Sequence, residues 1–374
     1  MEPGTTVKAP EELSKTRSKA LADDPELLTS MMAQAGRGGP LWNPTAYWRT
    51  YCERIMRELD RAGLADLRTN QRLLKGFALG GVPQPELPAT FWKRFLWKTI
   101  ESLPGPRQIV AEYRRVLSAE YRRRRDASRQ HARLAMDEIA RAFPDIRPPA
   151  GLANGGADDA FIWRGHAIVP AFVMYLSRVA DFYGRVPPRQ VTSILEIGPG
   201  LGLNSLAHIA LNPEVRVIVN IDIPPVLYLS TQFLKSIGEV AVVDTRVSQE
   251  SAHIVLEPAA TGVRIYQLAP WQLPKLEGSL DFFFNAFSFQ EMESEICRNY
   301  AAHVLRLVER GALLHSMTAG HRPEAGGQNA PVTLAFLESL FIQKFPHVSQ
   351  LDGFWPQLFD GNADSTRLMT AGNE

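Results

Sequence analysis

The feature of this chain that most restricts its fold is the stretch TSILEIGPGLGLNSLAHIAL, residues 192–211. It begins as a run of branched apolar residues, passes through glycines at alternate positions, and ends in a segment with helical spacing. A strand that bends through glycines into a helix is typical of a parallel α/β sheet. Glycine also lets the backbone approach a flat ligand closely. The stretch therefore predicts a ligand site at the carboxyl end of this strand.

The spacing of the glycines separates two kinds of ligand. Dinucleotide sites carry G-x-G-x-x-G, whereas Gly198, Gly200 and Gly202 read G-x-G-x-G. The strand also contains Glu196, whose negative charge would oppose a pyrophosphate and favour a cation. S-adenosylmethionine fits better, because it carries an ammonium and a sulfonium group and has no phosphate. We expect Asn204, where the following helix begins, to belong to the same site.

A second acid follows at the end of the next predicted strand. VRVIVNIDIPP, residues 215–225, is an almost wholly apolar run of the kind buried on both faces of a parallel sheet. Asp222, followed by Ile223, ends this run beside the same crevice and can accept hydrogen bonds from both hydroxyls of a ribose. NAD would also suit Asp222, so the choice of S-adenosylmethionine depends on Glu196 and the glycine spacing. An ordinary strand-to-helix turn is the structural alternative.

Helices and strands alternate from about residue 169 onward, which is the order of a doubly wound α/β fold. Strands are expected at residues 194–197, at 215–222, at 262–269, at 280–287 and at 311–318, with HVSQLDGFW and STRLMTAG as a final antiparallel hairpin. Upstream of a Pro-Pro pair at residues 148–149, apolar residues recur at helical spacing, with helices expected to begin near Asn43 and Thr90. We predict a helical region over residues 1–150 and a ligand-binding domain over 151–374.

Three segments of the chain resemble a known family. ILEIGPGLGLNSL, NIDIPPVLYLSTQFLKSI and LDFFFNAFSFQEM are similar to segments of bacterial sugar O-methyltransferases, and the likeness is strongest over residues 151–318. The resemblance implies a class I methyltransferase fold, with a Rossmann-like seven-stranded sheet and a helical N-terminal region. It also implies S-adenosylmethionine as the cofactor and a hydroxyl of a sugar or glycosylated metabolite as the acceptor. The family does not specify which acceptor is methylated.

The third predicted strand departs from many class I methyltransferases at its end. These enzymes often place an acid near the adenine amine, but GVRIYQLA ends in Ala269. Adenine recognition then falls to backbone groups or to Gln267. Asn285, at the end of the fourth predicted strand, is a further residue that we expect at the cofactor.

Candidate catalytic groups lie at the ends of the fourth and fifth predicted strands. A sugar hydroxyl is a poor nucleophile near neutral pH, so its methylation needs a base or a metal that lowers its pKa. Glu291 and His315 are the two candidate bases. As structural alternatives, Glu291 caps the following helix and His315 lies at a strand edge. No acids and histidine stand together at metal-ligand spacing, so we expect no metal site. The other histidines considered are expected to be structural or exposed: His208, His253, His303 and His347.

The segment EYRRVLSAEYRRRRDASRQHARLAMDEIARAFP, residues 112–144, suggests nucleic-acid binding as an alternative. The arginines at residues 122–125 are consecutive, so on a helix they point around it instead of forming one stripe. Leu134, Ile139 and Phe143 are expected to form an apolar face of the same helix. We expect a solvated basic side on an amphipathic helix. A contact with RNA, with an anionic substrate or with a partner subunit stays open.

Composition and charge restrict the class of protein further. The net charge of +1 at pH 7 gives no general attraction to nucleic acid or to an anionic membrane. The first residues are polar, and no run approaches the length of a membrane span, so we expect a cytoplasmic protein. Cys52 and Cys297 have no C-x-x-C partners and are expected to be buried thiols.

Taken together, these features predict an S-adenosylmethionine-dependent O-methyltransferase. The expected partner is a small-molecule acceptor that carries a sugar. The chain is expected to act alone or as a homodimer. Three alternatives remain open: an O- or N-methyltransferase for a non-sugar natural product, an RNA-modifying or RNA-binding protein, and a cofactor-binding fold kept only for assembly.

Overall fold

An eight-stranded sheet forms the centre of the computed structural model, which describes residues 18–36, 38–74, 106–248, 251–316, 332–351 and 364–370. In spatial order its strands are β5 (Val240–Val243), β6 (Val263–Leu268), β4 (Val217–Ile221), β3 (Ser193–Ile197), β7 (Phe282–Ala286), β8 (Arg310–Ser316), β10 (Asp364–Thr370) and β9 (His347–Leu351). The strands from β5 to β8 pair in parallel, and β10 pairs antiparallel with both β8 and β9. The predicted α/β fold and its final antiparallel hairpin are confirmed.

The prediction of seven strands is wrong by one. The additional strand is β5, which pairs only with β6 at the edge of the sheet. Its four residues are half-buried or exposed, so this run lacks the continuous burial of the central strands. A separate hairpin of β1 (Phe161–Trp163) and β2 (His166–Ile168) also escaped the sequence analysis.

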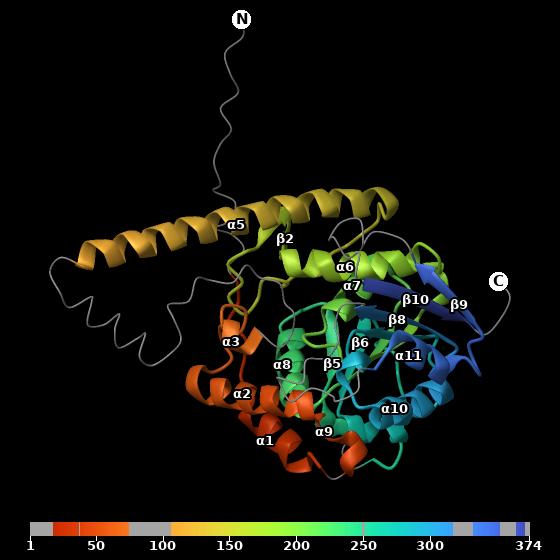
Figure 1. Ribbon diagram of the computed structural model, residues 1–374. Helices are drawn as coiled ribbons and strands as arrows, with labels where there is room; N and C mark the ends of the chain where they lie inside the picture. Colours follow the sequence, from red (N-terminus) through yellow and green to blue (C-terminus); the bar gives the residue numbers. More distant parts are fainter. Residues whose placement is uncertain are drawn as a thin grey trace, which may run out of the picture.

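Helices cover both faces of the sheet (Figure 1). α6 (Pro170–Tyr183), α7 (Leu203–Leu211) and α8 (Pro224–Lys235) share one apolar cluster, while α10 (Ser294–Leu307) and α11 (Leu334–Phe341) belong to the other. The three consecutive phenylalanines of β7 show this division, because neighbouring side chains on a strand point to opposite faces. Phe282 and Phe284 belong to the first cluster, and Phe283 belongs to the second. The shorter helices are α9 (Thr245–Ser248), η3 (Pro188–Gln190), η4 (Pro270–Lys275) and η5 (Phe289–Glu291).

Most of the N-terminal helices pack on the first of these faces, namely α1 (Pro25–Gln34), α2 (Ala46–Ala62), α3 (Gln71–Leu74) and α5 (Pro106–Ala142). The short helix η2 (Pro40–Trp42) contacts α10 on the other face. α1 and α2 contact α8, and α5 lies along α6 (Figure 1). Thr45 caps α2 by accepting a hydrogen bond from a backbone N–H, and the helix ends at Gly63. The helix expected near Thr90 lies outside the described residues.

The apolar face of α5 differs from the prediction. Ile139 is buried, as predicted, and Phe143 is half-buried, but Leu134 is 63% exposed, because the buried positions before Ile139 are Ala132, Ala135 and Met136. The arginines at 122–124 are exposed. Arg123 and Arg124 both form ion pairs with Glu120, at 2.7 Å each. The basic segment is therefore a solvated helix side, with part of its charge neutralised locally.

Replacing both Arg123 and Arg124 by glutamine is expected to leave any weak retention of RNA nearly unchanged. Each real phosphate contact would contribute close to one unit to the slope of log affinity against log salt. Retention of a structured RNA at several salt concentrations, with the wild-type chain as the control, measures that slope. A decrease of about two would identify this helix side as an RNA contact.

Both cysteines are buried free thiols, as predicted. Within the described residues, no helix has the length and apolar character required to cross a bilayer.

Candidate functional site

A pocket opens where β3, β4 and β7 end, with a volume of about 910 Å³ including its open mouth. The carboxyl edge of a parallel sheet is where ligands of this fold class bind. Six residues predicted from the sequence line it: Gly198, Gly200, Asn204, Asp222, Ile223 and Glu291. Residues from four further helices complete its wall, namely α2, α6, α8 and α10.

The loop after β3 requires glycine at several positions, because of its backbone conformation and because of its close neighbours. The backbone φ angles of Gly198, Gly200 and Gly202 are 71°, 59° and 79°, in the region that side chains rarely adopt. A Cβ atom on Gly198 would lie 2.3 Å from the Cβ of Ser288, which follows β7. A Cβ on Gly202 would lie 3.0 Å from Leu234 of α8. Glycine at these positions lets the loop pack closely against β7 and α8.

Asp222 lies directly after β4 and holds the glycine loop from the other side. Its carboxylate accepts hydrogen bonds from the backbone N–H of Gly200, at 3.2 Å, and of Ile223, at 2.8 Å. Burial raises the pKa of Asp222 to about 8, and the nearby carboxyls of Glu196 and Glu291 act in the same direction. A buried acid in this environment favours a ligand that brings hydroxyl donors or a positive charge.

Glu196 is fully buried on β3 and does not line the pocket. It accepts hydrogen bonds from Asn204 Nδ2 at 2.8 Å and from Ser205 Oγ at 3.1 Å. Asn204 itself lines the pocket. Burial raises the pKa of Glu196 to about 7. Its carboxyl therefore positions Asn204, and its predicted direct contact with the cofactor stays a prediction.

Asn285 and Gln267 are buried near the site without lining the pocket. Asn285 Nδ2 donates to the carbonyl oxygen of Ile197 at 2.9 Å, which joins the ends of β7 and β3. Gln267 Oε1 accepts from Ser230 Oγ of α8 at 2.8 Å. The roles predicted for both side chains at the cofactor stay predictions.

Glu291 ends the short helix η5 and lies within the pocket. Trp48 Nε1 donates to Glu291 Oε2 at 2.9 Å, and Thr45 Oγ1 donates to the Glu291 carbonyl oxygen at 3.2 Å. Burial raises the pKa of Glu291 to about 7, while the Trp48 hydrogen bond lowers it. The N-cap of α10 is Glu293, so the alternative that Glu291 caps this helix is wrong. A carboxyl with a pKa near neutrality can take a proton from a hydroxyl.

His315, the second candidate base, lies on β8 one residue beyond the last pairing with β7 and opposite Ser365 of β10. Its backbone is described and its side chain is not, so its catalytic role stays a prediction. His208 is buried, with its Nδ1 3.0 Å from the Tyr183 hydroxyl, and burial lowers its pKa to about 3. It is structural, as expected.

The sequence analysis missed the residues that reach the pocket from distant parts of the chain. Trp48 comes from α2, and Tyr175 and Arg178 come from α6. Phe287, just after β7, has a positive φ of 68°, which a bulky residue adopts only when its surroundings fix it. Trp48 belongs to the apolar residues whose helical spacing predicted a helix near Asn43, and no local signal distinguished these residues as pocket residues.

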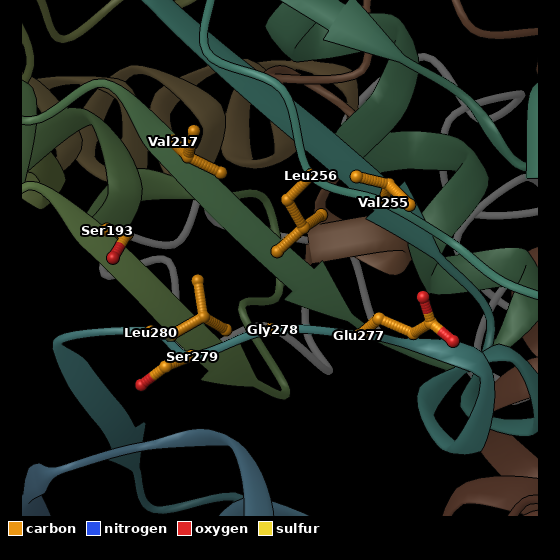
Figure 2. Close-up of a pocket in the computed structure, with 8 residues that line it drawn as sticks. All are labelled: Ser193, Val217, Val255, Leu256, Glu277, Gly278, Ser279 and Leu280. Atoms are coloured by element: carbon orange, nitrogen blue, oxygen red, sulfur yellow. The ribbon is translucent and has the colours of Figure 1, made fainter.

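A second hollow lies at the opposite, amino-terminal edge of the sheet (Figure 2). Ser193 and Val217, which begin β3 and β4, line it together with residues 277–280 before β7. Glu277 and Val255, also in its lining, are exposed. Because the glycine loop and the acids with raised pKa lie at the other edge, we assign the candidate site there. No group of three potential metal ligands occurs within the described part of the chain.

No family model matches the chain, and no curated protein matches it either. Solved structures with similarity include the pyocyanin biosynthetic protein PhzM, at 12% identity over 54% of this chain and 57% of that chain, with a TM-score of 0.35. Human N-acetylserotonin methyltransferase with S-adenosylmethionine matches at 13% identity over 54% and 58%, with a TM-score of 0.33. Magnesium protoporphyrin IX methyltransferase from Synechocystis PCC 6803, with bound S-adenosylhomocysteine, matches at 12% over 54% and 84%, with a TM-score of 0.32.

The free energy of unfolding of the ligand-free protein is expected to fall as the pH rises from about 4 to about 8. Burial raises the pKa of Asp222, Glu196 and Glu291, so the folded state holds these protons more tightly than the unfolded state. Their protonated forms support folding below the ordinary carboxyl pKa, and that support is lost as each carboxyl ionises in the folded protein.

Urea unfolding between about pH 5 and pH 8.5 measures this dependence. Asp222→Asn removes one of the three groups, so it should flatten the profile and make the ligand-free protein more stable near pH 8. Equal profiles for the variant and the wild type would contradict a buried ionising Asp222.

Proposed function

We propose that this chain is an S-adenosylmethionine-dependent O-methyltransferase whose acceptor is a hydroxyl of a sugar or glycosylated metabolite. One observation carries the proposal: the glycine loop, Asp222 and Glu291 line the same pocket at the ends of three neighbouring strands. A loop that admits a flat nucleoside, an acid for its ribose and a group that can accept a proton are the parts that this reaction needs.

The cofactor side of the proposed site consists of the glycine loop, Asn204, Asp222 and Ile223. Gly198 and Gly200 line the pocket, and glycine lets the backbone approach a flat nucleoside closely. Asp222 would accept hydrogen bonds from the ribose hydroxyls, since two backbone N–H groups already fix its carboxylate. The acidic pocket favours the positive charge of a sulfonium over a pyrophosphate.

The acceptor side consists of residues from the N-terminal region and from the segment after β7. Trp48 supplies a partly buried aromatic surface, against which an apolar face of a sugar ring can pack. Asn43 and Thr45 supply polar groups beside it. We therefore propose that the helical region within residues 1–150 shapes the acceptor pocket over the α/β domain at 151–374.

In this mechanism Glu291 is the general base. When bound, S-adenosylmethionine supplies an electrophilic methyl group on a positively charged sulfur. The pocket would hold the acceptor hydroxyl within reach of the Glu291 carboxylate, which would take the hydroxyl proton as the oxygen attacks. Trp48 and Thr45 hold Glu291 in place through hydrogen bonds to its carboxylate and its carbonyl oxygen. The proton passes from the acceptor oxygen to the carboxylate, so the neutral hydroxyl need not ionise in advance.

Two measurements test the proposed function. Titration calorimetry with S-adenosylmethionine and with NADH should give binding of the first and none of the second. Incubation with methyl-labelled S-adenosylmethionine and a panel of nucleotide-activated sugars and glycosylated metabolites should then transfer the label. If only a non-sugar natural product receives the label, the chain is still a methyltransferase, but its acceptor belongs to another class. Binding of NADH without S-adenosylmethionine would overturn the proposal.

A further inference from the structure

Arg178 is a buried cation on the wall of the candidate site. It lies near the end of α6, is 6% exposed and lines the pocket. Its guanidinium carbon lies 4.8 Å from the ring centre of Tyr175 and 4.6 Å from that of Phe287. Among the described residues that line this pocket, Arg178 carries the one positive charge, and the acids Asp222 and Glu291 line the same pocket.

The two aromatic rings affect both the charge and the movement of this guanidinium. Rings over a planar guanidinium stabilise its charge through cation–π interactions and restrict its movement. The N–H donors lie in the guanidinium plane, where a planar anion such as a carboxylate can accept two of them. Phe287 adopts a positive φ of 68°, so the backbone after β7 is held in a costly conformation at this contact. The arrangement favours a fixed cation that receives a carboxylate.

The charges of the pocket therefore match a zwitterion. Asp222 favours a cationic group, and Arg178 favours an anionic group of the same ligand. The amino-acid end of S-adenosylmethionine carries a carboxylate, an ammonium group and the adjacent sulfonium. This match rests on the proposed function, because it uses the proposed cofactor.

We propose that Arg178, which contacts the rings of Tyr175 and Phe287, binds the methionyl carboxylate of the cofactor and so fixes the direction of the methyl group. The same chemistry could come from a carboxylate on the acceptor. The two sources differ in one respect: only the cofactor's carboxylate makes Arg178 important for cofactor binding in the absence of any acceptor.

Titration calorimetry without acceptor tests this assignment with two ligands, S-adenosylmethionine and decarboxylated S-adenosylmethionine. The wild-type protein should bind the first about twentyfold more tightly, the scale of a charge-assisted pair in a buried site. Arg178→Met should lose that factor for S-adenosylmethionine and change the affinity for the decarboxylated ligand less than about twofold. Arg178→Lys keeps the positive charge but loses the two coplanar N–H donors of the guanidinium. Its affinity for S-adenosylmethionine should therefore lie between those of the wild type and Arg178→Met.

Arg68→Met is the matched control. Arg68 is also buried and lies 5.6 Å from the ring centre of Phe233, but it is not part of the pocket wall. This variant should keep the wild-type ratio of the two affinities even if it lowers stability. Equal losses for both ligands in Arg178→Met, or no loss for either, would overturn the inference and leave the proposed function standing. If the wild-type protein binds neither ligand, the proposed cofactor itself is wrong.

Discussion

Replacing Glu291 by glutamine is expected to lower kcat at least about a hundredfold, the usual scale for loss of a general base. Glutamine keeps the size of the side chain and can still contact Trp48, but it cannot take the proton of the acceptor hydroxyl. Affinity for S-adenosylmethionine should stay within about twofold, because the cofactor is expected at Asp222 and the glycine loop. Formation of S-adenosylhomocysteine with the best acceptor of the panel, together with calorimetry, separates the two effects.

Two further variants show whether Glu291 acts as the base. Trp48→Phe removes the hydrogen bond that lowers the pKa of Glu291, so the rise of kcat with pH, expected near pH 7, should move to higher pH. His315→Asn should leave kcat within a few-fold. A large loss in His315→Asn with near-normal turnover in Glu291→Gln would assign the base to His315 instead. Loss of turnover with a chelator would point to a metal.

Replacing Asp222 by alanine is expected to weaken binding of S-adenosylmethionine by about 2 kcal/mol, or roughly thirtyfold in Kd. The variant would lack the carboxylate that accepts hydrogen bonds from the ribose hydroxyls and attracts the positive charge of the ligand. The same change frees the N–H of Gly200, which loosens the loop that faces the adenosine. Calorimetry with S-adenosylmethionine and with S-adenosylhomocysteine measures the loss.

Asp281→Ala is the matched control for Asp222. Asp281 Oδ2 also accepts hydrogen bonds from backbone N–H groups, those of Thr192 at 2.6 Å and Ser193 at 3.0 Å, but at the amino-terminal edge of the sheet. Its replacement should lower stability and leave the Kd unchanged. An equal change of Kd in both variants would mean that the Asp222 effect is structural. If the wild-type chain binds NADH, the glycine loop is a dinucleotide-binding loop instead.

The helices and strands around the glycine loop were predictable because their signals are local. Apolar runs, glycine spacing and strand-end acids lie within a few residues of one another, and a parallel sheet brings its carboxyl ends to one edge. Glu291 entered the prediction in the same way, from its position after β7. The edge strand β5 was missed because its four residues have no buried pattern, and Leu134 was misplaced because its apolar character did not match the helical spacing of α5.

The amino-acid sequence by itself determined the α/β order, the loop from Gly198 to Gly202, and the two acids Asp222 and Glu291, since each depends on short-range spacing. Tertiary structure decided what surrounds these residues. It buried Glu196, whose carboxyl accepts a hydrogen bond from Asn204, and it brought Trp48 against Glu291 from a helix 243 positions away in the sequence. It also set Arg178 over the ring of Phe287. Contacts between distant segments depend on how whole helices pack on the sheet, and no local pattern in the chain encodes that packing.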